Sequence, residues 1–573
     1  MVNRGILLLI ATLSFSVPTL RAEPRTAVDL QPGAVSVTRP VTDDAGRHGT
    51  ARLVDLNPVV GAWLLLTLTW DGEEPQPYHL QVAEPGRVRV SLDGRSARGV
   101  WLEGSGRGAS CPLWGAPEPA LEAARASALP FAPLCDGALF LRNPTRGHKT
   151  SIEKVTDVLR RHVPGGEALT GFVREEFFKD RFAETMPSER ATAEEAGALP
   201  DPAGAPQPAH LARDHAGDVL WARSLGVEPE GAPDLRLPAG RWLPAAGVPG
   251  VFLSVVKPAL LHPDLLEGQP GSVLALDPIE KNALVYLVAF DLDRYGLGFA
   301  LGTEHPALGW SDRVPARMHD ETRPGPDGID SAAPLVRTGM LDPADAARVV
   351  ATFSGGFKRY HGAFKSGDLA FKNDGSHYGF VEEGVVLSRL IPGLATAIAW
   401  DDGRVELKTW DAADDARLAH VRYARQNGVT VAERGPSGVV PGRLVRHWVP
   451  GNWSGNATQS LRTVRGGLSI VERDGHRFLV YAYFSAATPS AMVRVYQAYG
   501  VSYGMMLDIN ALEHTYLAVY RNDGAAIRVQ PLVRGMEEKD GGTDEQVAPR
   551  FLGKPDNRDF FFLTVRNPER VSR

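Results

Sequence analysis

The chain has 573 residues, of which 43% are hydrophobic and 23% charged, and its formal net charge is −6. This length predicts two or three domains, and the composition excludes a disordered chain. No run of lysine and arginine stands out, so nothing favours a nucleic acid or an anionic membrane as a partner.

Residues 1–22 have the pattern of an export signal. Arg4 supplies positive charge, an apolar run follows over residues 5–17, and Leu20-Arg21-Ala22 is an imperfect cleavage pattern. The apolar run is too short to span a bilayer, and no later stretch reaches that length without charge. We therefore expect an exported protein, periplasmic or extracellular, with no integral membrane segment after signal removal.

The chain has two cysteines, Cys111 and Cys135. In an exported protein we expect them to form one disulfide, and a pair of free thiols is the alternative. A metal site is not expected here, because the spacing is not Cys-x-x-Cys and no His-x-x-x-His accompanies it.

The first half of the chain divides into three segments. Residues 23–110 are expected to form a β-rich module, in which the run from Trp63 to Trp70 predicts a strand. Residues 111–186 are a mixed α/β segment, where Thr150 and Glu153 form a capping-box pattern at a helix start. Residues 187–250 are rich in Pro, Ala and Gly, which predicts a linker or a long surface excursion.

Residues 251–573 are expected to form the second domain, with a core at about 277–535. Hairpin turns are predicted at Glu383-Gly384, Asp402-Gly403, Asp474-Gly475 and Asp523-Gly524. One helix begins at Thr488-Pro489 and ends at Gly500. The predicted class is α+β: mostly antiparallel sheet with a few helices, preceded by the smaller β-rich N-terminal module.

A pair of glycines, Gly355-Gly356, lies between bulky residues and is followed by Lys358 and His361. Paired glycines let the backbone approach a ligand closely, and the lysine can offer charge to an anion. A tight turn between two strands is the alternative. His361 is a candidate acid/base or binding residue, or a polar loop residue.

Further candidates lie in three later segments. An apolar strand delivers Asp508 to a strand end, with Asn510 after it, although a turn aspartate is the alternative. Arg462-Thr463 precedes a second glycine pair, where an arginine can bind phosphate through two parallel hydrogen bonds or belong to an ordinary loop. Arg425 and Asn427 belong to a compact polar triplet.

No cofactor and no metal ion are expected. Asp291-x-Asp293 with Gly296 faintly resembles a calcium loop, but Gly302 stands where that loop needs its glutamate. Nucleophile and nucleotide motifs do not occur in a convincing context.

In order and spacing, these segments resemble the phosphodiester glycosidase domain family over about residues 284–529. The matching pieces are Phe353 to Lys358, residues 392–396 with the Asp402-Gly403 turn, Arg425 to Asn427, Arg462-Thr463 and Leu507-Asp508. Two departures stand out. Ser354 replaces the asparagine of the family, and Ile509 to Leu512 replaces its glycine- and serine-rich block.

The resemblance implies an exported hydrolase of a glycosyl phosphodiester or a related envelope or extracellular glycan. Asp508 and Arg462 would be its catalytic residues, with Asp508 acting as acid/base and Lys358 binding phosphate beside Arg462. The substrate-binding candidates are Gly355, Gly356, Lys358, His361, Arg425, Asn427, Thr463 and Asn510. A second carboxylate is needed, for which Asp374 and Glu382 are candidates. The alternative is an inactive glycan-binding or envelope structural module with the same fold.

Overall fold

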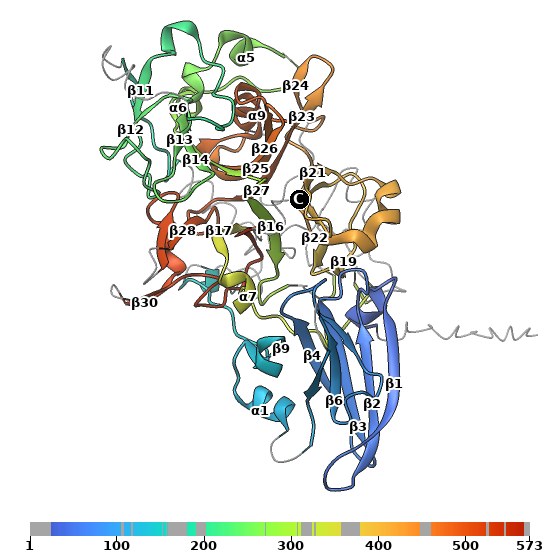
Figure 1. Ribbon diagram of the computed structural model, residues 1–573. Coiled ribbons are helices and arrows are strands. Elements are labelled where there is room, and N and C mark those ends of the chain that lie inside the picture. The colour runs from blue at the N-terminus through green and yellow to red at the C-terminus, as the bar shows by residue number, and fades with distance from the viewer. Residues whose placement is uncertain are drawn as a thin grey trace, which may run out of the picture.

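The structure is a computed structural model. It describes residues 25–104, 108–115, 119–151, 153–155, 158, 180–190, 202–269, 271–305, 308–310, 324–325, 328–356, 379–446, 460–522, 527–543 and 546–566. Its strands form mainly antiparallel sheets, with few and short helices (Figure 1). The antiparallel part of the predicted fold class is confirmed, and the protein is mainly β.

The N-terminal strands form a six-stranded sheet of order β1-β2-β3-β4-β9-β8. Its strands are β1 (Val35–Thr42), β2 (His48–Asp55), β3 (Trp63–Trp70), β4 (Gln76–Val82), β8 (Phe131–Leu134) and β9 (Leu139–Arg142). A second sheet contains β5 (Arg89–Ser91), β6 (Gly99–Glu103) and β7 (Ala109–Pro112), and helix α1 (Ala120–Ala126) follows. The strand predicted at β3 is confirmed.

Both N-terminal sheets contribute to one apolar core, which Leu66, Leu80 and Val100 share. Cys111 is fully buried in this core and forms a disulfide with Cys135, so the predicted pairing is confirmed. Cys135 lies in the 3-10 helix η2 (Cys135–Gly137), directly after β8. The disulfide therefore ties the small sheet to the edge of the large one.

Residues 202–250 belong to the segment predicted as a linker or a long surface excursion. They form β11 (Asp218–Trp221), β12 (Arg236–Pro238) and β13 (Leu243–Pro244), and β10 (Glu189–Arg190) pairs with β11. Leu220, Leu237 and Trp242 are buried in the main core. The high proline and glycine content here reflects close turns between short buried strands.

The main core is built on an eight-stranded sheet of order β13-β14-β15-β26-β25-β27-β23-β24. Its further strands are β14 (Val251–Val256), β15 (Val285–Asp291), β23 (Ala432–Gly435), β24 (Gly438–Pro441), β25 (Thr463–Arg473), β26 (His476–Ala487) and β27 (Tyr503–Ile509). Helix α9 (Pro489–Ala498) begins at Thr488, whose hydroxyl accepts a hydrogen bond from Ala491 N. Both the hairpin at Asp474-Gly475 and this helix start are as predicted.

Two five-stranded sheets complete the second domain. One has the order β16-β32-β17-β28-β29, with β16 (Tyr295–Ala300), β17 (Val349–Ser354), β28 (Leu517–Asn522), β29 (Ile527–Pro531) and β32 (Phe560–Val565). The other has the order β19-β18-β22-β20-β21, with β18 (Phe380–Glu382), β19 (Val385–Ser388), β20 (Ala395–Trp400), β21 (Val405–Thr409) and β22 (Val421–Gln426). The predicted hairpins at Glu383-Gly384 and Asp402-Gly403 are present.

The remaining elements are short. They are η1 (Ala27–Leu30), η4 (Arg213–His215), η5 (Pro258–Leu260), α5 (Pro263–Glu267), α6 (Pro278–Asn282), α7 (Pro343–Ala346), η8 (Ala412–His420), η9 (Met536–Lys539), β30 (Gly541–Thr543) and β31 (Gln546–Ala548). Capping aspartates start two of these helices, Asp277 at α6 and Asp342 at α7. Each side chain accepts hydrogen bonds from two backbone N–H groups of its first turn, which fixes the helix start.

The N-terminal module is joined to the second domain by buried hydrogen bonds. The Asn57 amide donates to Gly384 O at 2.8 Å and to Ala419 O at 3.1 Å. Gln81 donates to the Asp342 carboxylate at 3.1 Å. These contacts place the end of the N-terminal sheet beside β18, β19 and α7 (Figure 1).

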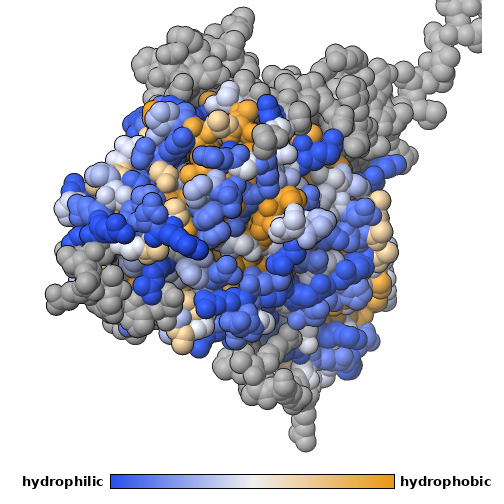
Figure 2. Space-filling model, turned by 90° about the horizontal axis from the view of Figure 1, so that it is seen from above, coloured by the Kyte–Doolittle hydropathy of each residue, from blue (hydrophilic) through white to orange (hydrophobic). Residues whose placement is uncertain are grey.

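Seen from above, the molecule shows a mostly hydrophilic face with small apolar patches (Figure 2). Such a mixture is usual for a folded globular protein. In the part of the chain that the structure describes, no helix is both long enough and apolar enough to cross a membrane.

Candidate active site

The glycine pair lies at the end of β17, where both residues are in close contact with other segments. Gly355 N donates to Asp559 O at 2.9 Å. Gly356 has φ of +117°, and a Cβ there would lie 2.7 Å from Asn427 Cγ. A side chain is therefore excluded at Gly356 by both backbone conformation and space, as expected where backbone must approach closely.

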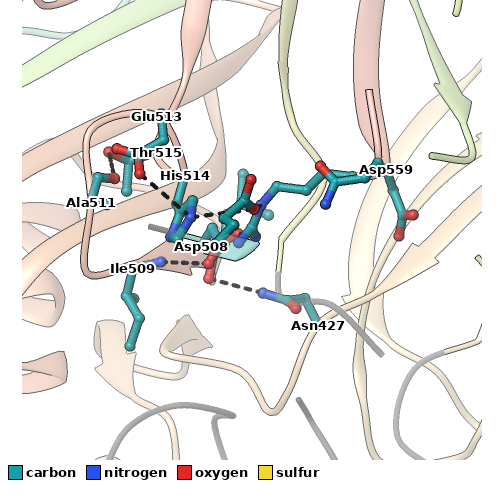
Figure 3. A network of polar contacts seen from close by, with 12 residues as sticks. Asn427, Asp508, Ile509, Ala511, Glu513, His514, Thr515 and Asp559 are labelled. Carbon is teal, nitrogen blue, oxygen red and sulfur yellow. Dashed lines mark hydrogen bonds and ion pairs between the residues drawn. The ribbon is translucent and has the colours of Figure 1, made fainter. Parts of the chain in front are cut away.

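Asn427 connects the glycine pair to the strand that carries Asp508. It is fully buried after β22, and its side-chain amide donates to Met506 O at 2.5 Å and to Leu507 O at 3.1 Å. Asp508 is the next residue after Leu507 and lies in β27. The segments of Asn427 and Asp508 thus lie side by side (Figure 3), and Gly356 packs against Asn427.

Asp508 is 4% exposed, and both oxygens of its carboxylate are hydrogen-bonded. Oδ1 accepts from Ile509 N at 2.9 Å, and Oδ2 accepts from Arg558 Nη1. The Nε atom of Arg558 lies 3.3 Å from Oε1 of Glu153. One guanidinium therefore holds two carboxylates, one from each half of the chain.

These residues belong to a larger group of buried ion pairs, which we call the Asp508 cluster. Its members are Glu153, Asp508, Lys539, Arg550, Asp556 and Arg558. The Lys539 ammonium lies 2.8 Å from Asp556 and 3.4 Å from Glu153, and Arg550 Nε lies 2.8 Å from Asp556. Three cations thus balance three carboxylates, and buried charges require such pairing.

The electrostatics of the Asp508 cluster follow from this balance. Burial by itself would lower the pKa of Arg558, but Asp508 and Glu153 raise it above its ordinary value. Burial would raise the pKa of Asp556, yet Arg550 and Lys539 lower it to about 2. Burial and Arg550 lower the pKa of Lys539 to about 8. Asp556 is therefore stabilised in its ionised form.

Asp559 forms a second ion-paired group beside the first. Arg425 is fully buried, and its Nε lies 3.1 Å from Asp559 Oδ2, while His305 Nδ1 contacts Asp559 Oδ1. Burial would raise the pKa of Asp559, but His305 and Arg425 hold it below its usual value. The guanidinium of Arg425 also lies 4.8 Å from the centre of the Phe380 ring.

Ser354 stands where the resembled family has its asparagine. Its side chain is 2% exposed, and the described residues place no hydrogen-bond partner near its hydroxyl. Buried hydroxyls are rarely left without a partner. This position therefore offers a hydrogen bond directly beside the glycine pair.

The other predicted residues fall into two sets. Thr463 Oγ1 donates to Asn510 Oδ1 at 3.3 Å, at the strand ends next to Asp508. Arg462 instead contacts the carboxylates of Asp180 and Asp277, with Nε 2.5 Å from Asp180 Oδ1. Its guanidinium is occupied by these two residues. Lys358, His361 and Asp374 lie outside the described residues.

Glu382, the remaining candidate for a second carboxylate, lies at the junction with the N-terminal module. It accepts a hydrogen bond from Leu301 N at 3.1 Å and lies 3.7 Å from Arg142 Nη2. Burial raises its pKa to about 7, against the opposing effect of Arg142. It belongs to a second group, which we call the junction cluster: Arg142, Asp342, Asp345, Glu382, Glu383 and Arg422.

A cavity of about 1490 Å³ opens at this junction. Asp342, Asp345, Glu383 and Arg422 line it together with Trp400. Its lining includes no member of the Asp508 cluster. Among the described residues, two triads bring possible metal-ligating atoms within 4.8 Å of one another, namely Asp291, Asp293 and His476, and Asp342, Asp345 and Glu383. Neither triad includes Asp508.

Sequence reasoning missed Glu153 as a site residue and did not identify Arg558 or Asp559. Glu153 was expected only as a capping residue, and it does cap: its Oε2 accepts from Thr150 N at 3.1 Å. A signal for the other two was present. The charged run from Lys554 to Asp559 stands directly before the apolar strand that begins at Phe560.

Known proteins resemble this chain only weakly. No protein-family model matches the sequence, and no curated protein matches it either. Among solved structures, one match is the catalytic domain of zebrafish N-acetylglucosamine-1-phosphodiester alpha-N-acetylglucosaminidase, with TM-score 0.30 and 9% identity over 66% of this chain and 100% of that one. Another is a hypothetical protein from Synechocystis, with TM-score 0.29 and 9% identity over 93% and 97%. Both are weak structural resemblances.

Proposed function

We propose that this protein is an exported hydrolase of a glycosyl phosphodiester or a related envelope or extracellular glycan. The observation that carries the proposal is the meeting of Gly356, Asn427 and Asp508 from three distant segments. The order of these segments in the sequence also matches that of the phosphodiester glycosidase domain family, which the chain resembles. The Cys111–Cys135 disulfide supports export, because disulfides persist in oxidising compartments.

In this proposal Asp508 is the reacting carboxylate. Ile509 N–H and Arg558 fix its two oxygens, so its orientation is set before a substrate binds. The Ser354 hydroxyl offers a hydrogen bond beside Gly355-Gly356, whose backbone packs against Asn427 and Asp559. Asp508 acts as acid/base or stabilises positive charge at the sugar carbon in the transition state.

The phosphate contact is assigned to Lys358, the cation that follows the glycine pair in the sequence, and not to Arg462. Two carboxylates already occupy the Arg462 guanidinium. Displacing them would leave Asp180 and Asp277 without their cation. Arg425 is occupied as well, because it is fully buried and paired with Asp559, so it contributes charge from inside the protein and not by contact with phosphate.

A non-catalytic glycan-binding module is the second candidate. The observation that favours it is the low exposure of Asp508, at 4%, together with its ion pair to Arg558. An ion pair of this kind can serve stability alone. The two candidates differ in whether Asp508 contributes to turnover.

The test compares wild type with Asp508→Asn on a panel of sugar-1-phosphodiesters. Asparagine keeps the size and one acceptor oxygen but removes the charge, so we expect kcat/KM to fall by about 10² to 10⁴. Asp402→Asn, in an exposed turn, is the matched control and should retain wild-type turnover. Thermal unfolding of each variant verifies the fold.

Equal turnover by wild type and Asp508→Asn would remove Asp508 from the chemistry. If wild type turns over no member of the panel yet binds a glycan saturably, the second candidate holds and the hydrolase proposal is wrong.

A further inference from the structure

The first half of the chain contributes Glu153 to the candidate site. It stands 405 positions before Arg558 and is 7% exposed. Oε2 accepts from Thr150 N at 3.1 Å, which holds the carboxylate in place from its own side. Its contact with Arg558 is therefore a buried link between the two halves of the protein.

Glu153 faces three cationic or titratable groups from the second domain. Arg558 Nε lies 3.3 Å from Oε1, Lys539 Nζ lies 3.4 Å from Oε2, and His514 Nε2 lies 3.8 Å from Oε1. Glu513 lies 3.7 Å from the same histidine and is the other carboxylate near it. Glu153 is thus the carboxylate at which these cations converge.

Arg558 uses separate nitrogens for its two carboxylates, Nε for Glu153 and Nη1 for Asp508. A guanidinium is planar and rigid, so fixing one edge fixes the direction of the other N–H groups. The position of Glu153 therefore determines how Arg558 presents Nη1 to Asp508.

We infer that Glu153 is a positioning residue for Asp508. It orients Arg558 and supplies the second negative charge that balances Arg558 beside Asp508. The inference rests on the proposed function for its kinetic consequence. It assigns the N-terminal half a part in the active site, where sequence reasoning found no role for it.

The charge balance gives the inference a distinctive pH signature. Without the charge of Glu153, Arg558 faces Asp508 with less compensation. A carboxylate near unbalanced positive charge releases its proton at lower pH. The limb of the pH–rate profile that reports Asp508 should therefore move to lower pH.

The test uses the full chain with Glu153→Gln, Glu153→Asp and Glu189→Gln. Glutamine retains the size and the acceptor for Thr150 N but not the charge, and aspartate retains the charge. Glu189 is an exposed carboxylate of the same half, paired with Arg236, and serves as the matched control. We expect about a tenfold loss of kcat with little change in KM for Glu153→Gln, and the acidic limb displaced to lower pH. Glu153→Asp should keep the wild-type limb, and Glu189→Gln the whole wild-type profile.

A loss of activity in Glu153→Gln with an unchanged pH profile would overturn the inference, because it would show a merely structural role. If wild type turns over no substrate, the proposed function fails. The contact between Glu153 and Arg558 is then tested by the free energies of unfolding of the variants. Non-additive effects of Glu153→Gln and Asp508→Asn in a double-mutant cycle then support the positioning contact, and additive effects overturn it.

Discussion

The Asp508 cluster and the junction cluster both bury carboxylates beside arginines, yet their electrostatics are opposite. In the Asp508 cluster, Arg550 and Lys539 lower the pKa of Asp556 to about 2. In the junction cluster, burial and Asp342 raise the pKa of Asp345 to about 7, and burial raises that of Glu382 to about 7. Burial is similar in the two places, so it does not explain the difference.

Close contact with buried cations explains it. Lys539 and Arg550 both lie 2.8 Å from the Asp556 carboxylate. Glu382 lies 3.7 Å from Arg142, and Asp345 pairs with the partly exposed Arg348 beside the carboxylates of Asp342 and Glu383. Where cations suffice, ionisation stabilises the fold, and where they do not, a proton takes the place of the missing cation. The comparison teaches that a buried acid must be judged with its whole group of neighbours.

The largest expected effect comes from removing the shared cation. Arg558→Met leaves Asp508 and Glu153 buried without their common partner, and we expect the free energy of unfolding to fall by about 3–5 kcal/mol. Urea denaturation at pH 7 measures it. Arg404→Met, which breaks an exposed pair with Glu406, is the control and should change stability by less than about 1 kcal/mol. A similar change in both variants would contradict the view that the Asp508 cluster is balanced.

The next effect is the pH dependence of the junction. Unfolded Glu382 releases its proton near pH 4.5, while in the native state it does so near pH 7, so the native state holds more protons between these values. The free energy of unfolding should fall by about 3 kcal/mol as pH rises through this window. Glu382→Gln should flatten that part of the curve.

The pH dependence that Asp556 contributes has the opposite sign and can be measured in the same experiment. Its native pKa of about 2 lies below its ordinary value of 3.8, so it stabilises the protein above pH 3.8 and that contribution is lost as pH falls toward 2. Glu382→Gln should leave this acid limb unchanged. Denaturation measured from pH 2 to 8 on both proteins shows the two windows, and identical curves would contradict the assignment to Glu382.

The smallest expected effect tests how the junction is held. Asn57→Ala removes the hydrogen bonds to Gly384 O and Ala419 O and leaves these carbonyls without that partner. It also removes the local bonds that Asn57 Oδ1 accepts from Val59 N and Val60 N. We expect a loss of about 1–2 kcal/mol in urea denaturation. Thr42→Ala, exposed on the same N-terminal sheet, should change stability by less than about 0.5 kcal/mol. Equal losses of stability in the two variants would show that the hydrogen bonds of Asn57 do not stabilise the junction.

Local signals predicted local structure well. The turns at Glu383-Gly384, Asp402-Gly403 and Asp474-Gly475, the cap at Thr488 and the strand at β3 all follow from residues close together in the sequence. Such signals depend on neighbouring residues and need no knowledge of the fold. In residues 202–250 local signals say less, because the burial of Trp242 is decided by distant strands and not by its own proline-rich surroundings.

The candidate site could be predicted only in part. Gly356, Asn427 and Asp508 were identified because their segments keep a recognisable order. Glu153 and Arg558 were missed because their pairing joins positions 405 residues apart, and each residue alone resembles an ordinary surface charge. Contacts at such separation leave no periodic or spacing signal in a single sequence.

The place of β32 in its sheet has a consequence for how the protein is made. β32 lies between β16 and β17, although it follows every other described strand in the chain. Arg558 and Asp559 come directly before it. Synthesis up to residue 557 therefore yields a chain whose central sheet lacks an inner strand and whose Asp508 has no arginine partner. The site is assembled only when the final segment is inserted, so fragments cut short before β32 will lack both the site and the sheet that supports it.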